Sequence, residues 1–176
     1  MEPTELRAQL EALHTESFGW ALACSDPARA ESVLQQSYLK VLDGRARYEG
    51  RSSFKTWFFG VVRNTAREDR RRALWRKLRL VPEESAERVA RPGVIEESLL
   101  AAELRQAMQR TLSLLPRRQR EVLHLVFYQE LTLEEAAAAM SVSVGSARTH
   151  YDRGKKRLRE LLEKEPVSHD LRRAGA

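Results

Sequence analysis

The stretch from Met140 to Lys156, MSVSVGSARTHYDRGKK, passes within a few positions from small and branched residues to hydrogen-bonding and cationic ones. Helical spacing places Val144, Ala147, Tyr151 and Leu158 on one face and leaves the polar side chains on the other. Short polar and arginine side chains at the front of a helix suit base edges in the DNA major groove, and cations further along suit phosphates. The chemistry that these residues support is recognition, and the simpler alternative is a solvated charged helix.

The preceding segment, LTLEEAAAAM, explains how such a helix would be positioned. Thr132 and Glu135 have the spacing of a capping box, which predicts a helix start. The four alanines 136–139 make that helix narrow enough for another helix to cross it closely. The short SVS turn follows, and Ser143 can cap the next helix. Two short helices joined by a tight turn form a helix-turn-helix, so the register of these signals favours DNA binding over a solvated face.

Residues that could perform catalysis are not grouped along the chain. The acids Glu68 and Asp69 lie among arginines that can pair with them, and no glycine-rich loop of the kind that holds phosphates is present. Cys24 stands alone among apolar residues, which predicts a buried inert thiol. We therefore expect no enzyme activity, no metal, no cofactor and no small-molecule substrate. The histidines lack metal-ligand spacing; they are His14, His124, His150 and His169.

The composition supports a polyanionic partner. The 176 residues carry a formal net charge of +6, and 32% of them are charged. Arginine leads the excess, and its planar fork binds phosphate in a bidentate manner. No apolar run approaches the roughly 20 residues that a membrane helix needs, so we expect a cytoplasmic protein without membrane insertion.

Helical periodicity extends through the first half of the chain. The segment from Ala30 to Leu42 repeats its apolar residues at helical spacing, and Asp26 and Pro27 supply its start. A second helix begins near RSSFKTWFF, where Ser52 or Ser53 can act as the cap. One stripe of that helix should enter the core: Phe54, Trp57, Phe58, Val61 and Thr65. Its other side should project Arg63, Arg67 and Arg70.

The middle of the chain differs from both halves. Between residues 81 and 103 there are six acidic residues and two arginines, with two prolines and a glycine. This composition is typical of a linker. The sequence thus predicts an all-α protein of two small helical domains, residues 1–79 and 99–164, joined by an acidic linker at 80–98 and followed by a tail at 165–176. In the second domain, Val122, Leu123, Val126 and Phe127 should point inward.

Two long stretches resemble one family. AESVLQQSYLKVLDGRARYEGRSSFKTWFFGVVRNTAREDRRR is similar to region two, and LLPRRQREVLHLVFYQELTLEEAAAAMSVSVGSARTHYDRGKKRLREL to region four, of bacterial RNA polymerase sigma factors in the extracytoplasmic-function (ECF) group. The resemblance implies a transcription initiation factor with core RNA polymerase and promoter DNA as partners. Compact folding of the basic blocks against each other or onto a partner would hide the DNA-binding faces of the free protein, so we also expect an inhibitory anti-sigma factor as a partner. The alternative is a stand-alone helix-turn-helix regulator, which leaves the first block unexplained.

The resemblance also implies roles for individual residues. For the minus-thirty-five promoter element they are Arg117, Arg118, Ser146, Arg148, Thr149, His150, Asp152, Arg153, Lys156 and Arg157. For the minus-ten element and strand opening they are Arg51, Ser52, Ser53, Lys55, Arg63, Asn64 and Arg67. For docking on core polymerase they are the outward side chains Glu31, Gln35, Gln36 and Lys40. Asp152 could accept a bond from a cytosine amino group or orient Arg153.

Three positions depart from the family's pattern. Ser32 stands where an acidic residue is common, which predicts a weaker or different contact with polymerase. Ser141 and Glu130 stand where glycine is usual. If the backbone has a positive φ there, both residues are strained relative to glycine.

Overall fold

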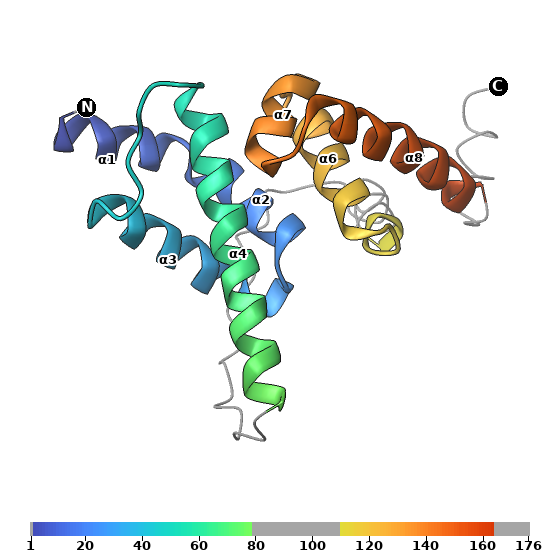
Figure 1. Cartoon of the computed structure of the whole chain (residues 1–176), viewed down its shortest axis with the longest axis horizontal. Helices are drawn as coiled ribbons and strands as arrows, with labels where there is room; N and C mark the ends of the chain where they lie inside the picture. The colour runs from blue at the N-terminus through green and yellow to red at the C-terminus, as the bar shows by residue number, and fades with distance from the viewer. Residues whose placement is uncertain (1, 79–109, 164–176) are drawn as a thin grey trace, which may run out of the picture.

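A computed structural model of the chain describes residues 2–78 and 110–163, and within these ranges it contains helices and no strand. The predicted all-α class is therefore confirmed. The first block comprises α1 (Pro3–Ala12), α2 (His14–Cys24), the 3-10 helix η1 (Pro27–Arg29), α3 (Ala30–Leu42) and α4 (Phe54–Leu78) (Figure 1).

The second block begins, in the described part, with a helical turn at 110–113. It continues with α6 (Arg117–Phe127), α7 (Leu133–Met140) and α8 (Val144–Leu162). The predicted linker at 80–98 and tail at 165–176, with the exact domain bounds that depend on them, lie outside the described residues.

The predicted helix starts of the first block form with the expected bonds. The Asp26 carboxylate accepts a hydrogen bond of 3.0 Å from the backbone N–H of Ala28, and η1 then leads directly into α3. The Ser53 hydroxyl accepts one of 3.2 Å from the backbone N–H of Thr56, so Ser53 rather than Ser52 caps α4. Each cap satisfies a backbone donor that the first helical turn leaves free.

The second block shows the same agreement. The Thr132 hydroxyl accepts from the Glu135 N–H, and the Glu135 carboxylate accepts from the Thr132 N–H, which completes the capping box of α7. The Ser143 hydroxyl accepts a 3.1 Å bond from the Ser146 N–H and starts α8. These bonds are local in sequence, so the residue types alone determine where α7 and α8 begin.

Helix α4 is buried on more than the predicted face. Phe54 and Phe58 of the expected stripe are buried, but so are Phe59 and Val62 around the helix. The indole N–H of Trp20 in α2 donates a 2.9 Å hydrogen bond to the Phe59 carbonyl, which fixes α2 along α4. A helix that is apolar on two sides needs two neighbours, and the second block supplies the other one.

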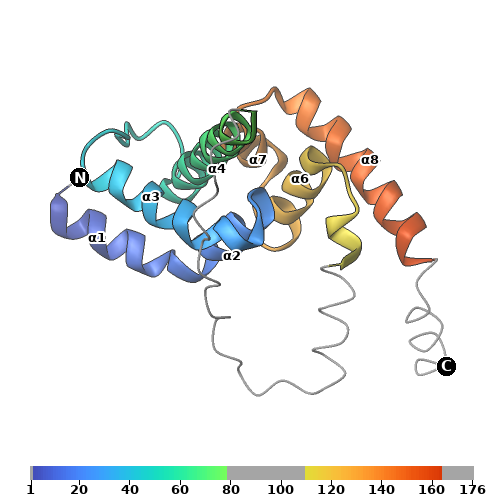
Figure 2. The same ribbon diagram turned by 90° about the horizontal axis from the view of Figure 1, so that it is seen from below.

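The two blocks pack directly on each other, with α7 lying across α4 and α6 beside α2 (Figures 1 and 2). A Cβ on Gly60 of α4 would lie 3.7 Å from the Ala139 carbonyl oxygen of α7. The helix that crosses the narrow α7 closely is therefore α4 of the other block. The buried apolar residues of both blocks form one contiguous cluster, in which Trp20, Phe59, Leu125 and others take part.

Candidate nucleic-acid interface

The inner face of α8 fixes its position on the second block. Ala147 is fully buried, and Gly154 lies where α8 crosses α6 so closely that an added Cβ would be 3.1 Å from the Cδ1 of Leu123. The Tyr151 ring stacks on Phe127 with ring centroids 5.9 Å apart. The prediction that Val144 is buried is wrong, because this first-turn residue is 38% exposed.

Phe127 is also more exposed than its spacing suggested. Its side chain is 55% exposed, whereas Val122 and Leu123 are buried as predicted. Phe127 is the last residue of α6, where the chain leaves the core, and the Tyr151 ring stacks on it.

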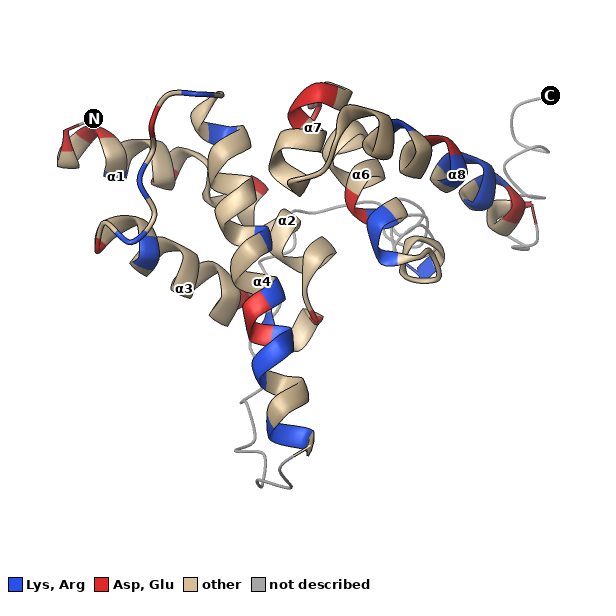
Figure 3. Cartoon of the chain, viewed as in Figure 1, with Lys and Arg blue, Asp and Glu red and all other residues tan. Residues whose placement is uncertain are grey.

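The outer face of α8 presents the predicted recognition residues to solvent. The exposed side chains are Ser146, Arg148, Thr149, Asp152, Arg153, Lys156 and Arg157, and Figure 3 shows the basic ones along the helix. The Thr149 hydroxyl donates to the Gly145 carbonyl at 2.9 Å, and Arg157 pairs with Glu160 at 3.2 Å. Asp152 pairs with Lys155 at 3.5 Å and not with Arg153, so the structure does not support the idea that Asp152 orients Arg153.

The positive charge continues from α8 onto the start of α6. Partial burial lowers the pKa of His150, and the nearby cations Arg118 and Arg153 lower it further. These three residues therefore share one positive region. Among the described residues no ion pair involves Arg118 or Arg153. Both cations are thus available to a phosphate or a base edge.

The turns before and after α7 each contain a residue with a positive φ angle at a position where the family usually has glycine. Ser141 has φ 51 and Glu130, before α7, has φ 55. Both lie in the left-handed region, where a side chain is disfavoured and glycine is not. The condition of the prediction, a positive φ at both positions, is therefore confirmed.

Only some of the residues predicted to contact the minus-ten element are exposed to solvent. Asn64 and Arg67 are exposed on α4 and, with Glu68 and Arg71, line a hollow. In the loop before α4, Arg51 is exposed and lies 2.7 Å from Glu49.

The residues that follow Arg51 make contacts within the protein. The Ser52 carbonyl accepts a 2.5 Å bond from the Tyr48 hydroxyl, and Ser53 serves as the cap of α4. Lys55 is half-buried and forms a 2.7 Å ion pair with Glu16.

Arg63 does not lie where helical spacing placed it. Instead of projecting into solvent it is 2% exposed, because α6 and α7 of the second block cover this side of α4. Its Nε donates to the Glu121 carboxylate at 2.9 Å, and another guanidinium nitrogen donates to the Met140 carbonyl at 2.5 Å. Arg117 lies 2.6 Å from the other Glu121 oxygen. Two predicted DNA contacts thus share one buried carboxylate.

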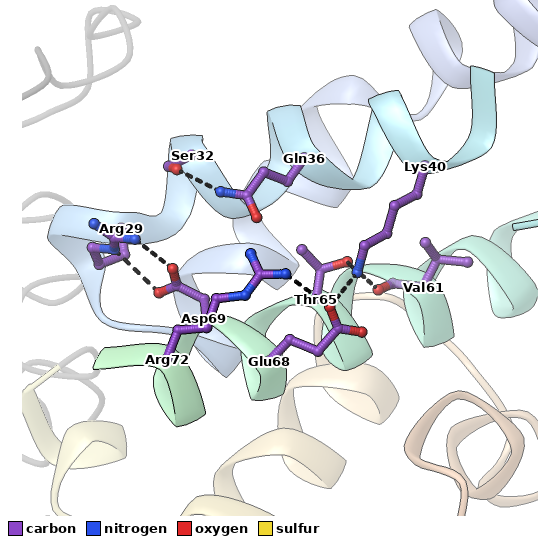
Figure 4. Close-up of polar contacts among 9 residues, drawn as sticks. All are labelled: Arg29, Ser32, Gln36, Lys40, Val61, Thr65, Glu68, Asp69 and Arg72. Atoms are coloured by element: carbon purple, nitrogen blue, oxygen red, sulfur yellow. Dashed lines mark hydrogen bonds and ion pairs between the residues drawn. The ribbon is translucent and has the colours of Figure 1, made fainter. Parts of the chain in front are cut away.

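Lys40 on α3 also points differently from the prediction (Figure 4). Its ammonium donates to the Thr65 hydroxyl at 3.0 Å and to the Glu68 carboxylate at 2.8 Å, so it ties α3 to α4 and does not face outward. Gln36 donates to Ser32 at 3.3 Å, which uses the serine that replaces the common acid.

The outer surface of α3 carries apolar residues that the sequence reasoning did not assign to it. Gln35 is exposed and bonds to Glu31 at 3.4 Å. Leu39 is 53% exposed, and Leu42, the last residue of the apolar repeat that begins at Ala30, is 49% exposed. Leu39 lies outside the buried stripe of α3, and an apolar residue at such a position was the signal that could have identified this exposed apolar surface.

The remaining charged and titratable candidates have structural roles. The Asp69 carboxylate is paired with an arginine, but with Arg29 of η1 and not with its neighbours in the sequence, and it joins α4 to η1. Burial raises the pKa of the Cys24 thiol to about 12, which agrees with an inert cysteine. Within residues 2–78 and 110–163 no cluster of metal-ligating side chains forms, and no helix there could cross a membrane.

Comparison with known proteins assigns both blocks to the same class of protein. Residues 16–76 match the family model for sigma-70 region 2, and residues 111–160 match that for sigma-70 region 4. The chain is 32% identical to the RNA polymerase sigma factor CarQ of Myxococcus xanthus over 77% of this chain and 75% of that protein. It is also 32% identical to the ECF sigma factor SigX of Bacillus subtilis (strain 168), over 84% of this chain and 79% of the relative.

Solved structures agree with this assignment. The chain superposes with a TM-score of 0.72 and 25% identity on the sigma factor RpoE solved with the anti-sigma factor NepR from Bartonella quintana, over 92% of this chain and 98% of that one. The fold also matches CnrH, solved with the cytosolic domain of CnrY, with a TM-score of 0.60. The chain belongs to the sigma-70 family of RNA polymerase sigma factors, in the ECF group, and is a transcription initiation factor.

Proposed function

We propose that this sigma factor binds core RNA polymerase and reads two promoter elements, the minus-thirty-five element with α8 and the minus-ten element with the start of α4 and the loop before it. The observation that carries the proposal is the outer face of α8, a solvent-facing row of short polar and basic side chains on a helix held by a capped turn. That geometry fits a recognition helix in the major groove.

Roles within the minus-thirty-five set follow from exposure and reach. Arg148, Thr149 and Arg153 lie on the outer face toward the front and middle of α8, so they contact base edges. Lys156, further along, and Arg118, at the start of α6, contact phosphates. Asp152 can accept from a cytosine amino group once Lys155 turns to a phosphate.

At the minus-ten element the chain assists strand opening. Extruding a base costs a few kcal/mol, which a stacking surface or pocket and cations along the freed strand can offset. Asn64 and Arg67 line an exposed hollow that can receive such a base, and Arg51, in the loop before α4, provides a further exposed cation. Phe54 and Phe58 are buried, so they support α4 and do not stack on DNA.

Docking on core polymerase uses the outer face of α3. Glu31 and Gln35 supply polar contacts, and the exposed Leu39 and Leu42 supply an apolar area that the polymerase would bury. The action is non-catalytic and takes place in the cytoplasm, where promoter DNA and polymerase are available.

An anti-sigma factor is a further partner under this proposal. One of the similar structures, the sigma factor RpoE, was solved with the anti-sigma factor NepR. Capture of the chain from its native cells tests this point: recovery of core polymerase without any second regulator would contradict it.

Run-off transcription tests the main proposal. Purified core polymerase should initiate at a cognate promoter only when the chain is added, and scrambling either promoter element should abolish the product. If the chain binds duplex DNA alone but never supports initiation, the stand-alone regulator is correct instead.

A further inference from the structure

Contact between the two blocks conflicts with reading both promoter elements at once. The two elements are centred about 25 base pairs apart, which is about 85 Å of duplex at about 3.4 Å per base pair. The longest described helix, α4, has 25 residues and spans about 37 Å. Blocks that pack side by side therefore cannot place α4 and α8 on both elements.

The surface between the blocks is specific and charged at its centre. Glu121 of α6 is completely buried and Arg63 of α4 is 2% exposed, with the two side chains 2.9 Å apart. Arg117 reaches the second carboxylate oxygen at 2.6 Å, without the alignment of a linear hydrogen bond. Partial burial lowers the pKa of the Arg117 guanidinium, and the negative charge of Glu121 opposes that shift. One carboxylate therefore pairs with two arginines at this contact, which leaves the three side chains with a net charge of +1.

Further contacts surround the charged centre. The Trp20 ring of α2 stacks on His124 of α6 with centroids 5.6 Å apart. The Arg120 guanidinium donates to the Ala23 carbonyl at 3.2 Å, and the Gln129 amide donates to the Glu16 carbonyl at 3.3 Å. Hydrogen bonds and a ring stack thus join the two blocks around the charged centre, although the second carboxylate oxygen of Glu121 and the amide oxygen of Gln129 have no hydrogen-bond donor among the described residues.

We propose that the free chain adopts this closed state by itself, and that Glu121 is the internal counter-anion that holds it closed. The inference rests on the proposed function, because only a protein that reads both elements has to open. In the closed state Glu121 occupies Arg63 and Arg117, which are both among the predicted DNA contacts. DNA phosphates compete with Glu121 for the same two guanidinium groups.

When the blocks separate, DNA phosphates replace Glu121 as the anionic partners of Arg63 and Arg117. When α6 and α7 leave α4, Arg63 becomes accessible beside the exposed Asn64 and Arg67. The outer face of α8 is already exposed in the closed state. The closed chain can therefore bind the minus-thirty-five element alone, and only joint engagement of both elements requires opening.

Intramolecular energy transfer tests the closed state in the full-length chain. Dyes are attached at Thr15→Cys in α2 and Ala138→Cys in α7, both exposed positions, in a Cys24→Ala background shared by every variant. We expect high transfer in the free chain and much lower transfer for Glu121→Gln, with the ratio of closed to open chain falling about 100-fold or more, because the buried Arg63 and the partly buried Arg117 lose their counter-ion.

Two further variants separate opening from general damage. Asp69→Asn removes another arginine-paired, nearly buried carboxylate, but one inside the first block, so transfer should remain high. Gly60→Leu places a bulky side chain between α4 and α7 without changing charge, so transfer should fall as for Glu121→Gln. Circular dichroism checks that each variant keeps its helices.

Several results would overturn the inference: low transfer in the unmodified free chain, unchanged transfer in Glu121→Gln, or equal loss in Asp69→Asn. Core polymerase with a promoter fragment carrying both elements should lower the transfer, whereas a duplex with the minus-thirty-five element alone should leave it high. High transfer in the complete promoter complex would also refute the need to open. A closed free chain that fails in run-off transcription would instead refute the proposed function.

Discussion

Single residues in the turns of the second block carry backbone strain. Ser141 and Glu130 occupy left-handed φ values of 51 and 55, where glycine avoids the clash between a Cβ and the backbone. Ser141 is exposed, and the bond from its N–H to the Ala138 carbonyl, 3.0 Å, uses only the backbone. Its side chain is therefore not needed to hold the turn.

Replacing Ser141 with glycine should stabilise the second block. We expect the free energy of unfolding to rise by about 0.5–1 kcal/mol, because relief of the left-handed strain exceeds the entropy that glycine adds to the unfolded chain. Urea denaturation measures this change. Ser141→Ala is the matched control, since it removes the hydroxyl but keeps the Cβ; equal stabilisation by both variants would show that φ is not the cause.

Arg153 tests the assignment of base contacts on α8. It is exposed and forms no ion pair with another described residue, so its guanidinium can form two bonds with a guanine edge. Arg153→Ala should lower discrimination between the cognate and a mutated minus-thirty-five element by about 1–3 kcal/mol. Competition binding at fixed salt measures it. Arg159→Ala, also on α8, is the control; an equal loss on every sequence would make Arg153 a phosphate contact.

At the scale of elements, the crossing of α6 and α8 depends on a glycine. A Cβ at Gly154 would lie 3.1 Å from Leu123 Cδ1 and 3.2 Å from Gln119 Cβ, closer than most real contacts. Gly154→Ala should therefore push the helices apart and destabilise the block by about 1–3 kcal/mol.

Gly145 offers a control on the same helix. A Cβ there meets nothing within 4 Å, so Gly145→Ala should stabilise α8 by about 0.5–1 kcal/mol through helix propensity. Thermal denaturation of both variants measures the difference. Stabilisation by both substitutions would mean that the close approach at Gly154 is not required.

The elements could be predicted from the sequence to the extent that their determinants are local. Caps at Ser53, Thr132 and Ser143 involve residues three positions apart, so the sequence displays both partners. Arg63 could not be placed in the same way. Its partner Glu121 is 58 residues away in the other block, and periodicity along α4 identifies an outer face without indicating what covers it.

In the candidate site, too, local features could be predicted from the sequence and contacts between distant residues could not. The outer face of α8 is solvent-facing and follows from helical spacing within one helix. Lys40 was misplaced because a long flexible side chain can turn toward an acid on another helix, here Glu68. Contacts that depend on how two helices pack require the structure.

At the scale of the whole molecule, His124 connects the closed state to pH. Its ring lies between Trp20 of the first block and Tyr128 of its own, at centroid distances of 5.6 and 5.3 Å. Burial lowers the pKa of His124 to about 4. Separation of the blocks removes Trp20 and returns the pKa toward the ordinary value of about 6.5.

The sign of the pH effect follows from this shift. The open state binds the proton more tightly, so the preference for the closed state is complete above about pH 6.5 and declines as the pH falls toward 4. With full exposure on opening, the loss reaches about 2 kcal/mol at pH 5. Energy transfer between the dyes at Thr15 and Ala138 should accordingly fall between pH 7.5 and 5. His124→Phe keeps a stacking ring but cannot be protonated, so its transfer should change much less; the same pH dependence in that variant would assign the effect to another group.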